Sequence, residues 1–85
     1  MTTITHMISD ELGLHARPAG AIVKFVKDFS GKIEIGTPEK MVDCKRIMGV
    51  MRLTLKQGDT LTITLDGEGE EAFAERLTTF LESQL

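Results

Sequence analysis

The stretch from Gly13 to Ala19 reads Gly-Leu-His-Ala-Arg-Pro-Ala and brings together residue types that can handle a phosphoryl group. Proline is favoured in the first turn of a helix, so Pro18 predicts that a helix begins here with His15 at its mouth. Backbone amides at such a helix start are unpaired and, with the helix dipole, bind anions. Arg17 would add a bidentate phosphate donor. Because the positive end of a helix disfavours imidazolium, we expect His15 to be neutral and nucleophilic, as a transient phosphohistidine requires.

The same residues have a simpler interpretation, in which His15 only caps the helix and Pro18 only starts it. A group in an unusual electrostatic environment marks a functional site statistically and not in every case. The spacing of these residues alone therefore leaves both interpretations open.

A second notable segment, residues 47–51, has the sequence Ile-Met-Gly-Val-Met. We predict a short helix over residues 46–53 that is apolar on more than one side and cannot bury all of its side chains. Exposed methionine forms an adaptable contact surface, and an exposed apolar patch usually marks a partner site. We expect some of these residues to pack inward and the others to form a docking patch. Lys45, Arg46 and Arg52 flank it and would suit an acidic partner.

The remaining reactive side chains have structural interpretations. His6 shares a strand face with apolar neighbours and is expected to be half-buried. Cys44 has no partner for a disulfide and is expected to be a small buried filler. No ligand set for a metal accompanies either histidine, and no cofactor motif, glycine-rich phosphate loop or pair of catalytic carboxylates is present. Three glutamates match the positive end of a final helix: Glu68, Glu70 and Glu71.

Turn signals and apolar spacing predict the elements that must position these residues. Alternating residues predict strands at 3–8, 32–35, 41–43 and 60–65. Between the strands, we expect a polar loop with Gly13 as its flexible point and a turn at 36–40. Apolar residues at helical spacing predict a helix from Ala16 that Gly31 closes; its inward face is Ala19, Ile22, Val23, Val26 and Phe29. A final helix follows residues 66–69, with the face Phe73, Leu77, Phe80 and Leu81.

The predicted order of elements is therefore β-α-β-β-α-β-α. Each strand has one apolar face and one face of threonine or charged residues, so the sheet should be covered on one side only. This pattern predicts an α+β fold, a two-layer open-faced sandwich of a four-stranded antiparallel sheet with three helices on one face. With 85 residues, we expect one domain over residues 1–85.

Composition and charge narrow the classes of function further. The chain is 41% hydrophobic and 27% charged, with no tryptophan or tyrosine, which disfavours a single-strand nucleic-acid binder. Residues 17–56 carry nine of the ten lysines and arginines but only four of the thirteen acidic residues, a basic island in a chain of net charge −3. Such an island attracts phosphates or acidic partners. The first residues lack the pattern of a signal peptide, so we expect a cytoplasmic protein without membrane insertion.

Residues Gly13 to Ala19 resemble the active-site signature of the HPr family, the histidine-containing phosphocarriers of the bacterial phosphoenolpyruvate-dependent sugar phosphotransferase system. The segment 45–51, Lys-Arg-Ile-Met-Gly-Val-Met, resembles the second signature of that family at the spacing from His15 that the family uses. Length and predicted element order agree as well. The resemblance therefore covers essentially the whole chain.

The resemblance implies a phosphocarrier and not a stand-alone enzyme. Enzyme I, charged from phosphoenolpyruvate, would pass a phosphoryl group to Nδ1 of His15, and the carrier would deliver it to an enzyme IIA domain. Arg17 and the backbone at Ala16 and Arg17 would steady the phosphoryl group. The docking surface would comprise Ala16, Arg17, Gly20, Ile47, Met48 and Met51. The resemblance also implies a monomer, with transcriptional regulators as further possible partners.

Two positions depart from the family pattern. Many members have a serine directly before the Ile-Met-Gly-Val-Met run, and in many Gram-positive bacteria a dedicated kinase phosphorylates it. This chain has Arg46 there, and no serine or threonine from Pro38 to Leu53, so we expect the regulatory branch to be missing. Gly20 stands where the family commonly has alanine, and this small change does not weaken the resemblance.

Three alternatives to a sugar-system carrier stay open. The same fold could serve a regulatory branch of phosphotransfer, such as the nitrogen-related one, although the Ile-Met-Gly-Val-Met segment favours the sugar branch. A protein that docks a transcription factor without being phosphorylated would lack the active histidine, and His15 is present. The third alternative, a small nucleic-acid-binding protein, is supported by the basic island alone.

Overall fold

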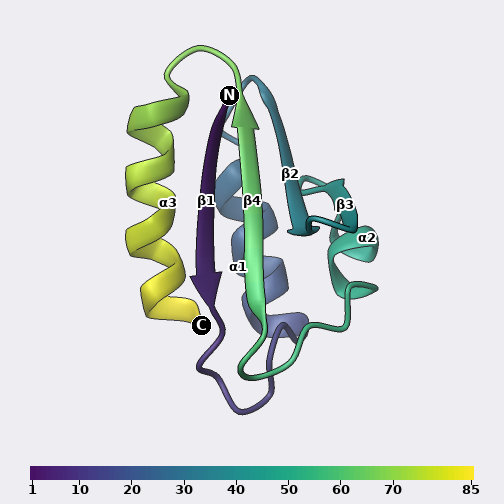
Figure 1. The fold of residues 1–85 in the computed structure, drawn as a ribbon. Helices are drawn as coiled ribbons and strands as arrows, with labels where there is room; N and C mark the ends of the chain where they lie inside the picture. Colours follow the sequence, from purple (N-terminus) through teal and green to yellow (C-terminus); the bar gives the residue numbers. More distant parts are fainter.

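Seven elements follow one another in the predicted order in the computed structural model, which describes residues 1–85 (Figure 1). The four strands are β1 (Thr2–Met7), β2 (Lys32–Thr37), β3 (Lys40–Asp43) and β4 (Thr60–Asp66). The three helices are α1 (Ala16–Val26), α2 (Ile47–Met51) and α3 (Glu70–Gln84).

The strands form one antiparallel sheet in the order β1-β4-β2-β3. Its register places Ile63 of β4 between Ile4 of β1 and Ile35 of β2, so apolar side chains line up on one face. Thr3 and Thr5 of β1 and the threonines of β4 point to the other face, because successive side chains of a strand alternate between faces. One face is therefore apolar and must be covered.

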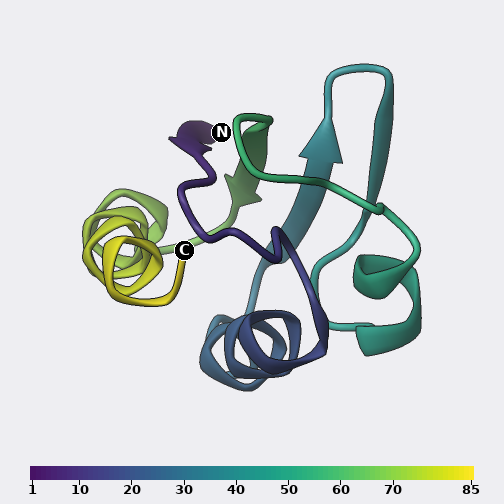
Figure 2. The same cartoon turned by 90° about the horizontal axis from the view of Figure 1, so that it is seen from below.

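Helices α1 and α3 pack against this apolar face, while the opposite face stays open (Figure 2). The core between the two layers includes Ile22 of α1, Leu77 of α3 and Ile63 of β4, each fully buried. Four phenylalanines join the helices, with the rings of Phe25 and Phe80 stacked at a centroid distance of 4.4 Å. The predicted open-faced α+β sandwich is confirmed. No helix is long and apolar enough to cross a membrane.

The bounds predicted for the first helix and for the turn at 36–40 were wrong. Helix α1 ends at Val26 and not at Gly31, and Phe29 reaches the core from the connection that follows. Gly31 instead allows two segments to approach closely, because a Cβ there would lie 2.4 Å from the carbonyl oxygen of Asp66. The turn predicted at 36–40 comprises only residues 38 and 39, since Thr37 already pairs with Lys40.

Helix α2 is shorter than the predicted range of 46–53 and spans residues 47–51. Arg46 has an extended backbone and serves as its N-cap, and residues 52 and 53 form a turn. The single helical turn keeps Val50 in the core and leaves its neighbours at the surface.

Glu70, predicted as a charge match for the last helix, lies in the first turn of α3 and also ties that helix to strand β1. Its carboxylate accepts hydrogen bonds from the Thr2 hydroxyl and from the Gly67 amide, and the α-ammonium group of Met1 lies 3.1 Å away. These contacts, led by the Thr2 hydrogen bond, lower the pKa of Glu70 to about 2. The charged form of Glu70 is therefore favoured by folding.

We expect Glu70→Gln to lower the urea midpoint of unfolding at neutral pH more than Glu71→Gln does. Both substitutions remove one charge from the first turn of α3, but only Glu70 has these partners. A carboxylate whose pKa is lowered in the folded state stabilises the fold above its unfolded pKa and loses that effect as the pH falls through its folded pKa. The difference between the two variants should therefore shrink as the pH falls from about 4.5 towards 2. A difference that stays constant from neutral to acid pH would contradict this account.

Candidate functional site

His15 occupies the position that the sequence predicts, at the mouth of helix α1. It is the N-cap residue, with an extended backbone (φ −95°, ψ −177°), and its carbonyl accepts the first hydrogen bond of the helix, from the amide of Ala19 at 3.0 Å. The amides of Ala16 and Arg17 find no acceptor in the protein, and Pro18 has no N–H to offer. Two free amides therefore lie beside the imidazole at the positive end of the helix.

The loop before His15 is held by close backbone contacts on one side. Gly13 has a φ of +67°, and a Cβ at this residue would lie 2.4 Å from the carbonyl oxygen of Leu55. The same carbonyl accepts the amide of Leu14 at 2.9 Å. Only glycine combines this backbone angle with this approach, so glycine is required at residue 13, and it fixes where His15 leaves the loop.

The loop also places Asp10 next to His15, a contact that the sequence analysis missed. Oδ2 of Asp10 lies 3.6 Å from Nε2 of His15. The other carboxylate oxygen accepts the amide of Leu12 at 2.8 Å, in the short local turn that aspartate favours. An aspartate that precedes a glycine-containing loop is a signal for such a turn, but the contact with His15 depends on the path of the whole loop.

Asp10 is itself held at its backbone. Its amide donates to the main-chain oxygen of Leu85 at 3.1 Å, and its carbonyl accepts the amide of Gly13 at 2.9 Å. The neighbouring Ser9 donates to the same main-chain oxygen of Leu85 through both its amide and its hydroxyl. The end of α3 thus anchors the loop that carries Asp10, and the lower parts of β1 and α3 lie side by side in Figure 1.

A hollow of about 420 Å³ opens beside the imidazole. Polar atoms predominate in it, and the side chains of His15 and Asp10 are about one-third exposed. Arg17 also lines the hollow and makes no ion pair within the protein. Its other lining residues are Leu12, Pro18, Ser83 and Gln84. The site thus combines a reachable imidazole, an unpaired guanidinium and two free amides, which suits a transient covalent phosphoryl group.

The predicted mixture of buried and exposed residues in segment 47–51 is confirmed. Val50 is fully buried and Ile47 is half-buried, whereas Met48 and Met51 are 62% and 41% exposed. Helix α2 packs beside α1, so these methionines lie on the helix next to the one that His15 caps. On α1, a Cβ added at Gly20 would meet no atom within 4 Å, so the surface there is open.

The prediction that Lys45 presents its charge beside the docking patch was wrong. The ammonium group of Lys45 turns inward and donates to the carbonyl oxygens of Phe29 and Gly31. Lys45 therefore supplies hydrogen bonds to the connection after α1, and its charge does not point to the surface where a partner would bind. Arg46 stays at the surface with its side chain 82% exposed, and its Nε lies 3.6 Å from the carboxylate of Asp43. Such an exposed pair contributes little to stability and leaves the guanidinium accessible.

The other reactive residues lie where the sequence predicted. His6 is half-buried, and its Nε2 has no hydrogen-bond partner. Cys44 is fully buried, and burial raises the pKa of its thiol to about 12. No three side chains of histidine, cysteine, aspartate or glutamate lie close enough together to hold a metal ion.

Comparisons with known proteins agree with this geometry. The family described as "PTS HPr component phosphorylation site" matches residues 2–83. The phosphocarrier protein HPr of Lysinibacillus sphaericus is 43% identical over 81 residues, which are 95% of this chain and 92% of the relative. The crystal structure of HPr from Thermoanaerobacter tengcongensis is similar with a TM-score of 0.89 at 36% identity, covering 99% of this chain and 94% of that one. An HPr dimer from the same organism is similar with a TM-score of 0.74, again at 36% identity, covering 98% and 95%.

Proposed function

The chain belongs to the HPr family of phosphocarriers of the phosphotransferase system, and from this premise we propose that His15 is its phosphoryl acceptor. Enzyme I, charged from phosphoenolpyruvate, would donate the group, and an enzyme IIA domain of a sugar transport system would receive it. The observation that carries the proposal is the reachable imidazole at the N-cap of α1 beside two amides without acceptors. The protein is then a covalent intermediate in transfer and not a stand-alone enzyme.

The local charges explain how His15 would hold a phosphoryl group. The amides of Ala16 and Arg17 point out of the helix start, where the dipole favours negative charge. The guanidinium of Arg17 has no carboxylate partner, so it can turn to the phosphoryl oxygens without breaking an ion pair. Ala16 and Arg17 are exposed, so the donor protein and the acceptor protein can each reach a phosphoryl group at this place in turn.

We assign partner binding to one surface that comprises Ala16, Arg17, Gly20, Ile47, Met48 and Met51. The exposed methionines and the bare helix surface at Gly20 supply apolar contact next to the reacting residue. Because Lys45 turns inward, the positive charge beside the patch comes from Arg17, Arg46 and Arg52. That charge would attract acidic surfaces of enzyme I and enzyme IIA.

Incubation with phosphoenolpyruvate and a matched enzyme I tests the proposed transfer. The expected result is one phosphoryl group per chain, seen as a mass increment that is lost in acid, because phosphohistidine is acid-labile. No increment with a preparation of enzyme I that phosphorylates another HPr would contradict the proposal.

We also propose that the carrier is a cytoplasmic monomer, and sedimentation at micromolar concentration would reveal a dimer if one forms.

The Arg46 side chain leads to a prediction about regulation. A phosphoserine at this place would add negative charge beside the docking surface and repel acidic partners. Arg46 cannot be modified in this way, so we expect the serine kinase of Gram-positive relatives, with ATP, to leave this protein unmodified. We expect Arg46→Glu to imitate the modified state and to slow phosphoryl transfer to His15 without unfolding the chain, since the side chain is 82% exposed.

A matched control separates the local effect of Arg46→Glu from its effect on net charge. Lys27 is exposed at the opposite end of α1 from His15, and Lys27→Glu changes the net charge equally. Transfer rates at low salt should fall for Arg46→Glu and change little for Lys27→Glu. Equal rates in the two variants, or an acid-stable phosphoserine or phosphothreonine on the parent after kinase treatment, would overturn this prediction.

A further inference from the structure

The fixed geometry of Asp10 points to a role in the chemistry of His15. Three polar groups of Asp10 are already engaged: its amide donates to Leu85 at the end of α3, its carbonyl accepts from Gly13 and its Oδ1 accepts from the amide of Leu12. The remaining oxygen, Oδ2, has no hydrogen-bond donor from the loop and lies 3.6 Å from Nε2 of His15. The carboxylate is therefore held in place before the imidazole reacts, and its free oxygen faces one particular ring nitrogen.

A neutral imidazole carries its proton on one nitrogen and its lone pair on the other, and a neighbouring group decides which. A carboxylate oxygen can only accept, so Oδ2 favours the tautomer in which Nε2 carries the proton. We propose that Asp10 is a positioning residue that holds His15 in this tautomer and so leaves the lone pair on Nδ1 for the phosphoryl group. This inference rests on the proposed function of His15 and concerns a residue outside both sequence signatures.

The proposed step balances without any further reactant. The lone pair of Nδ1 forms the bond to phosphorus, while the bond from phosphorus to the donor breaks and its electron pair leaves with the donor. His15 loses no proton, so the phosphorylated ring becomes positively charged and keeps its proton on Nε2. The carboxylate of Asp10 faces this proton and stabilises the positive ring. Delivery to the acceptor reverses the step and returns the ring to its neutral tautomer.

Asp10→Asn is an informative substitution because it preserves the turn and reverses the polarity at the ring. The amide oxygen can still accept from Leu12, which places the NH₂ group where Oδ2 was. An NH₂ group donates, so Nε2 would have to accept and the proton would move to Nδ1. The variant should therefore fold like the parent and have its nucleophilic lone pair on the wrong nitrogen.

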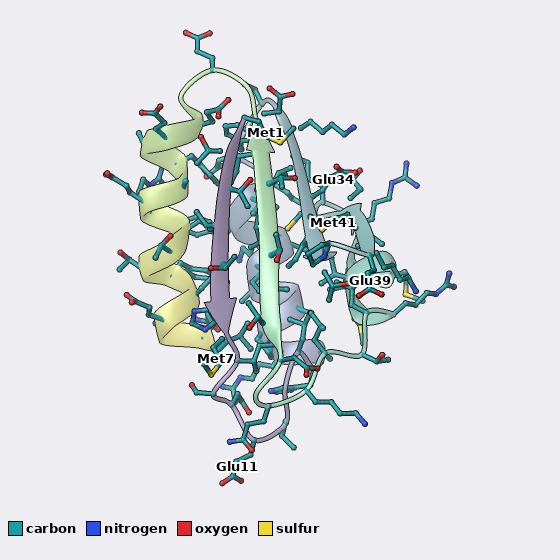
Figure 3. The ribbon with its side chains drawn as sticks, in the orientation of Figure 1. Met1, Met7, Glu11, Glu34, Glu39 and Met41 are labelled. Atoms are coloured by element: carbon teal, nitrogen blue, oxygen red, sulfur yellow. The ribbon has the colours of Figure 1, made fainter.

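Glu11→Gln is the matched control, because it removes the same charge from the next residue. Glu11 is exposed at the tip of the loop and points away from the body of the protein (Figure 3). It makes no ion pair with His15. Any effect of overall charge on enzyme I binding should be equal in the two variants, whereas an effect on the ring should occur only in Asp10→Asn.

The experiment measures ¹⁵N chemical shifts of histidine-labelled protein at alkaline pH, where the imidazole is neutral, together with the rate of phosphorylation by enzyme I. We expect the parent and Glu11→Gln to protonate Nε2, and Asp10→Asn to shift the population towards protonated Nδ1. The transfer rate should fall about 10-fold in Asp10→Asn alone, near the lower end for groups that orient a reactive histidine, because both side chains are partly exposed.

Equal tautomer populations in the parent and Asp10→Asn would overturn the inference, and so would a changed tautomer without a slower transfer. The spectroscopic result does not depend on phosphorylation. If the parent accepts no phosphoryl group, the proposed function fails while the tautomer is still measured. If the parent is phosphorylated and the ring does not respond to Asp10→Asn, the role of Asp10 alone fails.

Discussion

A His15→Ala variant should fold as the parent does and carry no phosphoryl group after treatment with phosphoenolpyruvate and enzyme I. The imidazole makes no side-chain hydrogen bond to the helix that it caps, so its removal costs the fold little. The free amides of Ala16 and Arg17 stay in place, but the nucleophile that they serve is gone. The expected effect is therefore complete loss of the acid-labile mass increment, with an unchanged far-ultraviolet circular dichroism spectrum.

The second histidine provides the control for this experiment. His6 lies within strand β1 and packs on the covered side of the sheet, with its Nε2 inaccessible. A large donor protein cannot bring a phosphoryl group to that nitrogen while the sheet is folded. His6→Gln should therefore be phosphorylated as the parent is. Phosphorylation of His15→Ala, or loss of phosphorylation in His6→Gln with the fold intact, would contradict the assignment.

Local patterns in the sequence were sufficient to predict the fold. The alternation in residues 60–65 and the spacing of Phe73, Leu77 and Leu81 identify faces that must be buried, and those faces meet in the core. Two of the errors occur where a glycine serves packing and not a turn. Gly31 ends no helix but lies against Gly67, and Gly36 lies inside β2, where a Cβ would meet the carbonyl of Lys40.

Prediction of the site was limited by contacts between distant segments. The position of His15 at a helix start follows from Pro18 a few residues away, so the sequence reveals it. The carboxylate of Asp10 faces His15 only because the main-chain oxygens of Leu85 and Leu55 anchor the loop from both sides. No local pattern encodes that arrangement. For the same reason, Lys45 looks like a surface charge in the sequence although its ammonium group binds backbone carbonyls inside the fold.

The second large effect is expected from Met48→Asp, which places a charge within the proposed docking surface. Met48 is 62% exposed and contributes little to the core, so the variant should fold normally. If Met48 is a hot spot of the interface, its loss weakens the complex by about 2 kcal/mol or more, which corresponds to roughly a 30-fold rise in Kd. If both partners use this surface, enzyme I and enzyme IIA should lose affinity together.

Met7 offers a matched control for the substitution of Met48. It is 67% exposed, at the end of β1 near the bottom of the sheet, away from α2 (Figure 3). Met7→Asp adds the same charge in place of the same side chain, so it reports the effect of charge and methionine loss without the proposed contact.

Calorimetric titrations should show weakened binding of both partners for Met48→Asp and near-parental binding for Met7→Asp. Added salt should also slow association with the parent, because the arginines beside the patch attract acidic surfaces through screened charges. Parental affinity of Met48→Asp for both partners would exclude a shared docking surface, and loss of affinity for one partner alone would show that the two proteins approach His15 from different sides.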